Sequence, residues 1–390
     1  MSRVIILLLD GVGCGELPDA ADYGDQGSNT LANLAKAVGG LSLPNLARLG
    51  LGSIIPIQGV PPQDKPQACF GKMAEQSVGK DSTTGHWEIA GLVTSTPFPL
   101  FPNGFPPEFI RSLEEAIGLK TIGNKAASGT EIIKELGEEH LRTGCPIVYT
   151  SADSVLQIAC HEDVIPPDEL YLICKKARGL CAGPFCVGRV IARPFTGKPG
   201  SFTRTAHRKD FSCSPPQPTL LDNVKEDGQP VVGIGKVDDL FAGRGFTETH
   251  HSVVNADCLR LTAEAMQKTK AGLVFTNLVQ FDMDWGHRNN SVAFAAGLKE
   301  FDDFLPNILN GLKRYDLLFI TADHGNDPTT SSTDHSREYV PLLAFGPGFR
   351  QGVDLGTRPT FADLGQTAAE FLKAKPTAHG TSCLKEIRHD

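Results

Sequence analysis

Short runs of apolar residues, many of them β-branched, recur along the chain, and most are followed by residues that favour turns. Apolar runs of this length are typical of strands buried on both faces of a sheet. Segments with apolar positions at helical spacing lie between several of them, at 31–38, 293–312 and 361–372. This alternation predicts an α/β protein with a mainly parallel sheet. The predicted strands are 4–9, 146–149, 231–234, 272–279, 316–321 and 339–345.

Two proline-rich stretches divide the chain. One runs from Pro97 to Pro107 and the other from Pro215 to Pro218. Proline interrupts helices and central strands, so both stretches are predicted to be linkers. The segment between them has about 115 residues, an ordinary domain size. We therefore expect a discontinuous core of residues 1–97 and 219–390, with a second domain inserted at 98–218.

The composition is that of a globular protein and narrows the classes of function. Of the 390 residues, 40% are hydrophobic and 21% are charged, and the formal net charge is −8. An acidic chain has no bulk attraction for nucleic acid or an anionic membrane, so neither is expected as a partner. Any phosphate ligand then needs a local cationic site. The first apolar run is too short for a signal sequence or a membrane span, and a cytoplasmic location is expected.

The chain has ten cysteines but no C-x-x-C motif. Small buried thiols in a reducing compartment are the simpler interpretation. The alternative is a structural zinc site at Cys174, Cys181 and Cys186.

Four segments gather carboxylates and imidazoles, three of them directly after predicted strands. In open α/β sheets, ligands bind beyond the carboxyl ends of strands, so one edge of the sheet can bring these residues together. Carboxylates mixed with imidazoles suit Mn²⁺ or Zn²⁺ better than Ca²⁺, and their number is enough for two ions. Two such ions clamp the attacking and leaving oxygens of a phosphoryl transfer. Taken singly, each residue also fits an ordinary turn or a solvated loop. The candidate ligands are Asp10, Asp282, His287, Asp323, His324 and His335.

A candidate nucleophile lies in the segment 79–88, which reads GKDSTTGHWE. Metal coordination lowers the pKa of a hydroxyl and activates it. The spacing alone does not choose among Ser82, Thr83 and Thr84.

The inserted segment carries a cluster of cations with glycines among them. This pattern fits two interpretations. The cations are either a basic surface exposed to solvent, or a pocket in which guanidinium groups bind a phosphate through paired hydrogen bonds. The cations are Arg189, Arg193, Arg204, Arg208 and Lys209.

Together these motifs resemble the phosphopentomutases, a family of the alkaline phosphatase superfamily. The resemblance covers nearly the whole chain and implies an alkaline-phosphatase-like core with an inserted α+β cap. It also implies two Mn²⁺ ions, one held by Asp10, Asp323 and His324 and the other by Asp282, His287 and His335. The most specific stretches are 79–91 (GKDSTTGHWEIAG), 150–162 (TSADSVLQIACHE), 187–195 (VGRVIARPF), 281–288 (FDMDWGHR) and 321–346.

By the same resemblance, the residue four positions before His86 carries the phosphoryl group. That residue is threonine in the family and Ser82 here. Serine fills the same place in the related cofactor-independent phosphoglycerate mutases, so Ser82 remains the predicted nucleophile, with Lys80 and His86 as helpers. The residues implied to hold the sugar and its distal phosphate are Asp153, Arg189, Arg193 and Arg204.

The implied reaction interconverts ribose 1-phosphate and ribose 5-phosphate, and the corresponding 2-deoxyribose phosphates. It passes through a phosphoserine and a sugar 1,5-bisphosphate, and a ribose or glucose bisphosphate primes the enzyme. A monomer is expected, although the sequence leaves the oligomeric state open.

Two alternatives remain at this level: a metal-dependent sugar-phosphate phosphohydrolase on the same core, and a non-catalytic relative that binds sugar phosphates. The chain departs from the family pattern at Asp284, which adds a carboxylate beside Asp282, and at the pair His250–His251. These departures concern substrate preference, metal preference or rate rather than fold.

Overall fold

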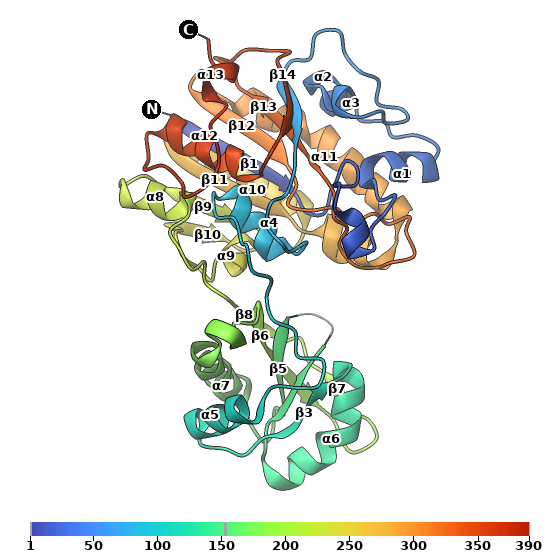
Figure 1. Ribbon diagram of the computed structural model, residues 1–390, viewed down its shortest axis with the longest axis vertical. Coiled ribbons are helices and arrows are strands. Elements are labelled where there is room, and N and C mark those ends of the chain that lie inside the picture. The colour runs from blue at the N-terminus through green and yellow to red at the C-terminus, as the bar shows by residue number, and fades with distance from the viewer. Residues whose placement is uncertain (1, 152–153, 390) are drawn as a thin grey trace. The chain divides into compact units, whose positions relative to one another are not determined.

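The computed structural model describes residues 2–151 and 154–389, which form two compact units. Unit 1 comprises Met1–Thr96 and Pro215–Asp390, and unit 2 comprises Pro97–Ser214. The chain therefore leaves unit 1, forms unit 2 and returns (Figure 1).

The strands of unit 1 form one sheet, which has eight strands among the described residues. They are β1 (Arg3–Leu9), β2 (Cys69–Met73), β9 (Val231–Ile234), β10 (Glu248–His250), β11 (Gly272–Leu278), β12 (Asp316–Thr321), β13 (Val340–Phe345) and β14 (Asp354–Arg358). Their order is β10-β9-β11-β1-β12-β13-β2-β14. Neighbours are parallel from β10 to β12, β13 is antiparallel to both of its neighbours, and β14 is parallel to β2. The expected mainly parallel sheet is confirmed.

Helices cover both faces of this sheet. The Thr276 hydroxyl on β11 lies 2.7 Å from that of Thr262, whereas the adjacent Phe275 stacks on His86. Successive side chains of a strand point to opposite faces, so the helices that carry Thr262 and His86 flank opposite sides. The helical elements are η1 (Ala20–Tyr23), α1 (Thr30–Ala37), α2 (Pro44–Leu49), α3 (Leu51–Ile54), α4 (Ser82–Ile89), α8 (Leu220–Glu226), α9 (Val237–Leu240), α10 (Asn255–Lys268), η3 (Phe281–Trp285), η4 (Gly286–Arg288), α11 (Ser291–Gly311), α12 (Ala362–Leu372) and α13 (Leu384–Ile387).

Strand β1 lies in the middle of the sheet and explains the first apolar run. Its residues Val4 to Leu8 are 0% exposed, because sheet neighbours and two layers of helices surround them. Leu8 pairs with Asn277 of β11 on one side and with Thr321 of β12 on the other. The three strands therefore end at one edge, which is where the sequence places the candidate ligands.

Unit 2 has a mixed sheet packed with helices, as expected for an α+β domain. Its elements are α5 (Pro107–Ile117), β3 (Ile122–Ala126), α6 (Gly129–Thr143), β4 (Ile147–Thr150), β5 (Val155–His161), α7 (Pro167–Leu180), η2 (Gly183–Phe185), β6 (Arg189–Thr196), β7 (Thr203–Arg204) and β8 (Lys209–Ser212). The strand order is β3-β4-β5-β6-β7, with β8 also paired to β6. Two separate apolar clusters form its core, one around Leu113 and Leu170 and the other around Ile132 and Phe195.

Among the described residues, no helix combines the length and the apolar character needed to cross a membrane.

Candidate active site

The carboxyl edge of the unit 1 sheet brings candidate ligands from distant parts of the sequence together. Asp10 directly follows β1, and Asp323 comes two residues after β12. Asp282 lies on η3, a π-helical turn that begins shortly after β11. Because β11, β1 and β12 are parallel neighbours, these side chains emerge at the same edge.

Asp10, Asp323 and His324, which we call the strand-end group, are almost completely buried. Their residue exposures are 1%, 0% and 1%. His324 Nε2 lies 3.3 Å from Asp10 Oδ1 and 3.4 Å from Asp323 Oδ2. The other ring nitrogen of His324, Nδ1, lies 3.0 Å from the carbonyl oxygen of Gly325. A proton on Nδ1 would be donated to that oxygen, leaving Nε2 to face the carboxylates.

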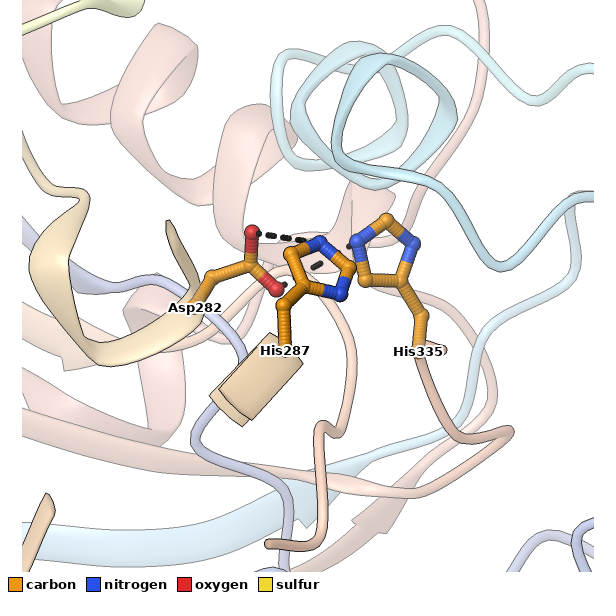
Figure 2. Close-up of side chains that lie close together, drawn as sticks. All are labelled: Asp282, His287 and His335. Carbon is orange, nitrogen blue, oxygen red and sulfur yellow. Dashed lines mark ion pairs between the residues drawn. The ribbon is translucent and has the colours of Figure 1, made fainter. Parts of the chain in front are cut away.

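Asp282, His287 and His335, which we call the loop group, are more open to solvent. Figure 2 shows the carboxylate of Asp282 paired with both imidazoles, with Oδ2 3.2 Å from His287 Nε2 and Oδ1 3.3 Å from His335 Nε2. His287 Nδ1 lies 2.6 Å from the carbonyl oxygen of Thr333, a contact that again fixes which nitrogen faces the carboxylate. The side chains of His287 and His335 are 37% and 15% exposed.

Asp282 connects the two groups. Its carboxylate, that of Asp10 and the ring of His324 offer ligand atoms that lie within 4.8 Å of one another. Asp323, which the resemblance places on the same ion as His324, also lies 2.9 Å from His86 Nδ1 through Oδ2. The structure thus brings all six candidate ligands into two adjoining groups, while their division between two ions stays a prediction.

Ser82 is the hydroxyl that meets this cluster. It is the first residue of α4, and its Oγ lies 3.0 Å from His324 Nε2. Asp81 caps the helix by accepting hydrogen bonds from the backbone N–H groups of Thr83 and Thr84 at 3.0 and 3.1 Å. The Thr84 hydroxyl is bound to Asp81 at 3.0 Å. The position of Ser82 at a helix N-terminus also favours a negatively charged phosphoryl group there.

The carboxylates and imidazoles of the cluster lie close enough to shift one another's pKa values. Burial by itself would lower the pKa of His324, but the nearby carboxylates, Asp323 first, raise it well above the ordinary value. Burial would likewise lower the pKa of His287, but the hydrogen bond and the charge of Asp282 raise it to about 9. Burial opposes the low pKa of Asp282, which the charge of His335 holds well below its usual range. A divalent cation bound here would replace the imidazole protons as the positive charge.

The residues present fit such a cation. Within the part of the chain that the structure describes, the buried atoms Asp10 Oδ1 and His335 Nε2 have no hydrogen-bond partner. Buried polar atoms are normally hydrogen-bonded, and each of these two faces another member of the cluster at 3.3 Å. Carboxylate oxygens and imidazole nitrogens are also common ligands of Mn²⁺ and Zn²⁺.

Two asparagines that the sequence analysis did not assign orient the carboxylates. Asn277 Nδ2 donates to Asp10 Oδ2 at 2.9 Å, and Asn326 Nδ2 donates to Asp282 Oδ1 at 2.6 Å. Asn277 places an amide near the end of a largely apolar strand, and this is the signal in the sequence that points to it. Such partners fix the direction in which a metal ligand points.

Lys80, in the loop before α4, forms ion pairs with residues of two other loops. It forms ion pairs with Asp25 at 3.0 Å and with Asp334 at 3.5 Å. Asp25 also accepts a hydrogen bond from the backbone N–H of Arg337 at 2.9 Å. The loop before α4 is thereby held against the loop that carries His335.

The departures from the family pattern lie outside both ligand groups. Asp284 accepts a hydrogen bond from Gln280 Nε2 at 3.0 Å. His250 pairs with Glu248 at 2.7 Å.

The predicted substrate-binding residues belong to unit 2. Arg189 lies 3.7 Å from Asp210, and Arg204 is exposed on β7. Burial and then the charges of neighbouring arginines lower the pKa of Arg193, which indicates a local excess of positive charge. Asp153 lies outside the described residues. That these residues bind a sugar phosphate stays a prediction.

Comparison with known proteins agrees with this geometry. A family model described as the Metalloenzyme superfamily matches residues 2–376. The phosphopentomutase of Dictyoglomus thermophilum is 60% identical over 387 residues, which cover 99% of each chain. The phosphopentomutase of Carboxydothermus hydrogenoformans is 59% identical over 388 residues and 100% of each chain.

The chain belongs to the phosphopentomutase family. As a phosphopentomutase-family protein it is an enzyme of the isomerase class that depends on a divalent metal. The PH0037 protein from Pyrococcus horikoshii has a similar fold, with a TM-score of 0.50 and 16% identity over 95% of this chain and 97% of that one. At this identity, the likeness concerns the fold alone.

Proposed function

We propose that this protein interconverts ribose 1-phosphate and ribose 5-phosphate, and the 2-deoxyribose pair, with Ser82 as the residue that carries the phosphoryl group. The observation that supports Ser82 most directly is its contact with His324, 3.0 Å from Oγ to Nε2, at the N-terminus of α4. The names of relatives that match over the full length support the substrate class.

The strand-end and loop groups would hold two divalent ions, which we propose to be Mn²⁺. When bound, such ions stabilise the negative charge on the transferring phosphoryl group and on the serine oxygen. Asn277 and Asn326 keep the ligand carboxylates of Asp10 and Asp282 in a fixed direction by donating hydrogen bonds to them.

The first transfer would start from phosphorylated Ser82. The 5-hydroxyl of ribose 1-phosphate attacks phosphorus, the bond from phosphorus to Ser82 Oγ breaks, and the hydroxyl proton passes to Ser82 Oγ. The products are ribose 1,5-bisphosphate and free Ser82. The amide dipoles at the start of α4, whose first residue is Ser82, favour the negative charge that develops on the serine oxygen during this step.

The second transfer would reverse the roles of the two phosphates. After the bisphosphate reorients, Ser82 Oγ takes the 1-phosphate, and ribose 5-phosphate leaves. We propose that unit 2 binds the sugar and its other phosphate, because guanidinium groups bind phosphate with paired hydrogen bonds. An unphosphorylated enzyme would need a ribose or glucose bisphosphate to enter the cycle. The proposed binding residues are Asp153, Arg189, Arg193 and Arg204.

The test is to incubate the metal-loaded protein with ribose 1,5-bisphosphate and to map covalent phosphate by mass spectrometry. We expect phosphate on the peptide that contains Ser82, and none on that peptide in Ser82→Ala. In parallel, isomer formation and free phosphate are measured from ribose 1-phosphate. Isomer formation without phosphate release supports the mutase, whereas phosphate release as the main product would establish the phosphohydrolase instead.

A further inference from the structure

Two cysteines of unit 2 lie in direct contact. The Sγ atoms of Cys186 and Cys213 are 3.1 Å apart. Cys186 follows η2, and Cys213 directly follows β8. The backbone fixes this approach, because the N–H of Cys213 donates to the carbonyl of Gly188 at 2.8 Å at the end of the β6–β8 ladder.

This pair differs from most thiols of the chain. Both of its members are half-buried, so a small reagent can reach them. Burial raises the pKa of the fully buried thiols, which makes them inert. These are Cys14, Cys69, Cys160, Cys174, Cys181, Cys258 and Cys383.

Arg178 gives the pair an electropositive neighbour. Its guanidinium donates to the carbonyl oxygens of Val187 and Cys181 at 2.7 and 2.9 Å, which places Nη2 4.0 Å from Cys186 Sγ. The hydrogen bond from Cys213 and the charge of Arg178 lower the pKa of Cys186 to about 6, although burial opposes them. The same hydrogen bond raises the pKa of Cys213. One thiolate beside one protonated thiol is the arrangement of a reactive dithiol.

We propose that Cys186 and Cys213 are a redox-active dithiol that a hydroperoxide such as hydrogen peroxide converts to an intramolecular disulfide. The Cys186 thiolate attacks one peroxide oxygen, the O–O bond breaks, and a sulfenic acid and one water form. Cys213 then attacks the sulfenic sulfur, and the hydroxyl group leaves with a proton as a second water. Two thiols are oxidised by two electrons and one peroxide is reduced to two waters. A small dithiol reverses the reaction by exchange.

Formation of the disulfide requires little movement of the two cysteines. A disulfide needs the two sulfur atoms about 1 Å closer than they are here. The backbone hydrogen bond between Cys213 and Gly188 and the ladder behind it can therefore remain in place. The site does not involve Ser82 or the ligand groups, so the proposal stands independently of the proposed reaction.

The first test is to treat the reduced full-length protein with hydrogen peroxide, to alkylate the remaining thiols and to map disulfides by peptide mass spectrometry. We expect the peptides that contain Cys186 and Cys213 to be joined, with a loss of two hydrogens that dithiothreitol restores. The cross-link should persist in Cys145→Ser, a half-buried control in the same unit, and disappear in Cys186→Ser and Cys213→Ala. Equal or faster pairing of any other two cysteines would overturn the proposal.

The second test measures the rate of alkylation of Cys186 by iodoacetamide against pH. At pH 6 the thiolate fraction should make Cys186 react about tenfold faster than an ordinary thiol, after allowance for its lower nucleophilicity. In Cys213→Ala the midpoint of the profile should move upward, because the hydrogen bond to the thiolate is lost. A wild-type midpoint at or above that of an ordinary thiol, about 8.5, would contradict the proposal.

Discussion

Both units bury histidines, but the surroundings shift the pKa of these histidines in opposite directions. In unit 1, His324 is 1% exposed, and its carboxylate neighbours raise its pKa well above the ordinary value although burial opposes this. In unit 2, His140 is 0% exposed, and burial lowers its pKa. His140 Nδ1 lies 2.7 Å from the carbonyl oxygen of Cys145, and its Nε2 accepts a hydrogen bond from the backbone N–H of His161 at 2.9 Å. These partners are neutral, and protonation of Nε2 would remove the second bond.

Sequence neighbours explain only part of the difference. The carboxylate that raises the pKa of His324 most is that of Asp323, the residue directly before it in the chain. His140 follows Glu138 and Glu139, but both of these side chains are exposed on α6. Of the carboxylates that face His324, Asp10 lies more than 300 positions away in the chain, at the end of a neighbouring parallel strand. The acidic surroundings of His324 therefore combine a sequence neighbour with a carboxylate that the sheet topology brings close, whereas the ring nitrogens of His140 face backbone groups.

The largest expected effect is at Ser82. Ser82→Ala removes the hydroxyl that we propose as the nucleophile, so isomerase activity should fall by about 10⁴-fold or more. Bound metal and the free energy of unfolding should stay unchanged, as measured by elemental analysis and urea denaturation. Ser82→Thr keeps a hydroxyl and should remain within about tenfold of wild type. If Ser82→Ala stays near wild type while Thr83→Ala or Thr84→Ala is inactive, the nucleophile is one of the threonines.

The next largest effect is at Asp282, which touches both ligand groups. Asp282→Asn should lower the affinity for Mn²⁺ by about 100-fold or more, because a neutral amide is a weaker ligand. Asp284→Asn is the matched control, since Asp284 faces Gln280 and should keep full metal content. Asp323→Asn should weaken one ion only. Titration calorimetry with Mn²⁺ measures these effects, and two full ions in Asp282→Asn would show that the ligand assignment is wrong.

The fold and the ligand types could be predicted because their signals are local. The apolar run that forms β1 is buried on both faces, and Asp10 and Asp323 follow strands that the pattern identifies. The rule that parallel strands present ligands at their carboxyl ends then places them together.

The remaining features depend on distances between segments that are remote in sequence. The pattern 79–88 left three hydroxyls equivalent, and only the approach of His324 to Ser82 distinguishes them. The roles of Asn277 and Asn326 could not be predicted for the same reason. Each donates a hydrogen bond to a carboxylate that is remote from it in the sequence. The contact between Cys186 and Cys213 likewise depends on how β8 pairs with β6, which spacing does not show.

The same substitution, made at His324 and at His140, tests the contrast between the two buried histidines. His324→Gln should reduce activity by about 100-fold through loss of a metal ligand. His140→Gln should leave activity unchanged and lower the free energy of unfolding by about 1–3 kcal/mol, because buried hydrogen bonds are disturbed. Steady-state kinetics and denaturant unfolding measure the two effects. A large loss of activity in His140→Gln at unchanged stability would show that the two histidines are not of different kinds.

The smallest expected effect is the response of unit 2 to acid. Since the pKa of His140 is lowered in the folded protein, the unfolded chain binds the proton first as the pH falls below 6.5. Folded unit 2 should then lose stability with falling pH, by at most about 1.4 kcal/mol per pH unit. His140→Gln should flatten this dependence, and Glu139→Gln, on the exposed face of α6, should keep it. The described tryptophans, Trp87 and Trp285, lie in unit 1, so hydrogen exchange of α6 peptides is the suitable measurement.

The direction in which stability changes with pH distinguishes the environment of His140 from that of His324. A histidine charged by carboxylates would stabilise its fold as the pH falls, because the folded state would then bind the proton more tightly than the unfolded chain. Protection of α6 that increases between pH 7 and 5 in wild type, and not in His140→Gln, would therefore place His140 in the same class as His324. Protection that decreases over this interval confirms that burial keeps the pKa of His140 below the ordinary value, in contrast to the carboxylate-faced His324.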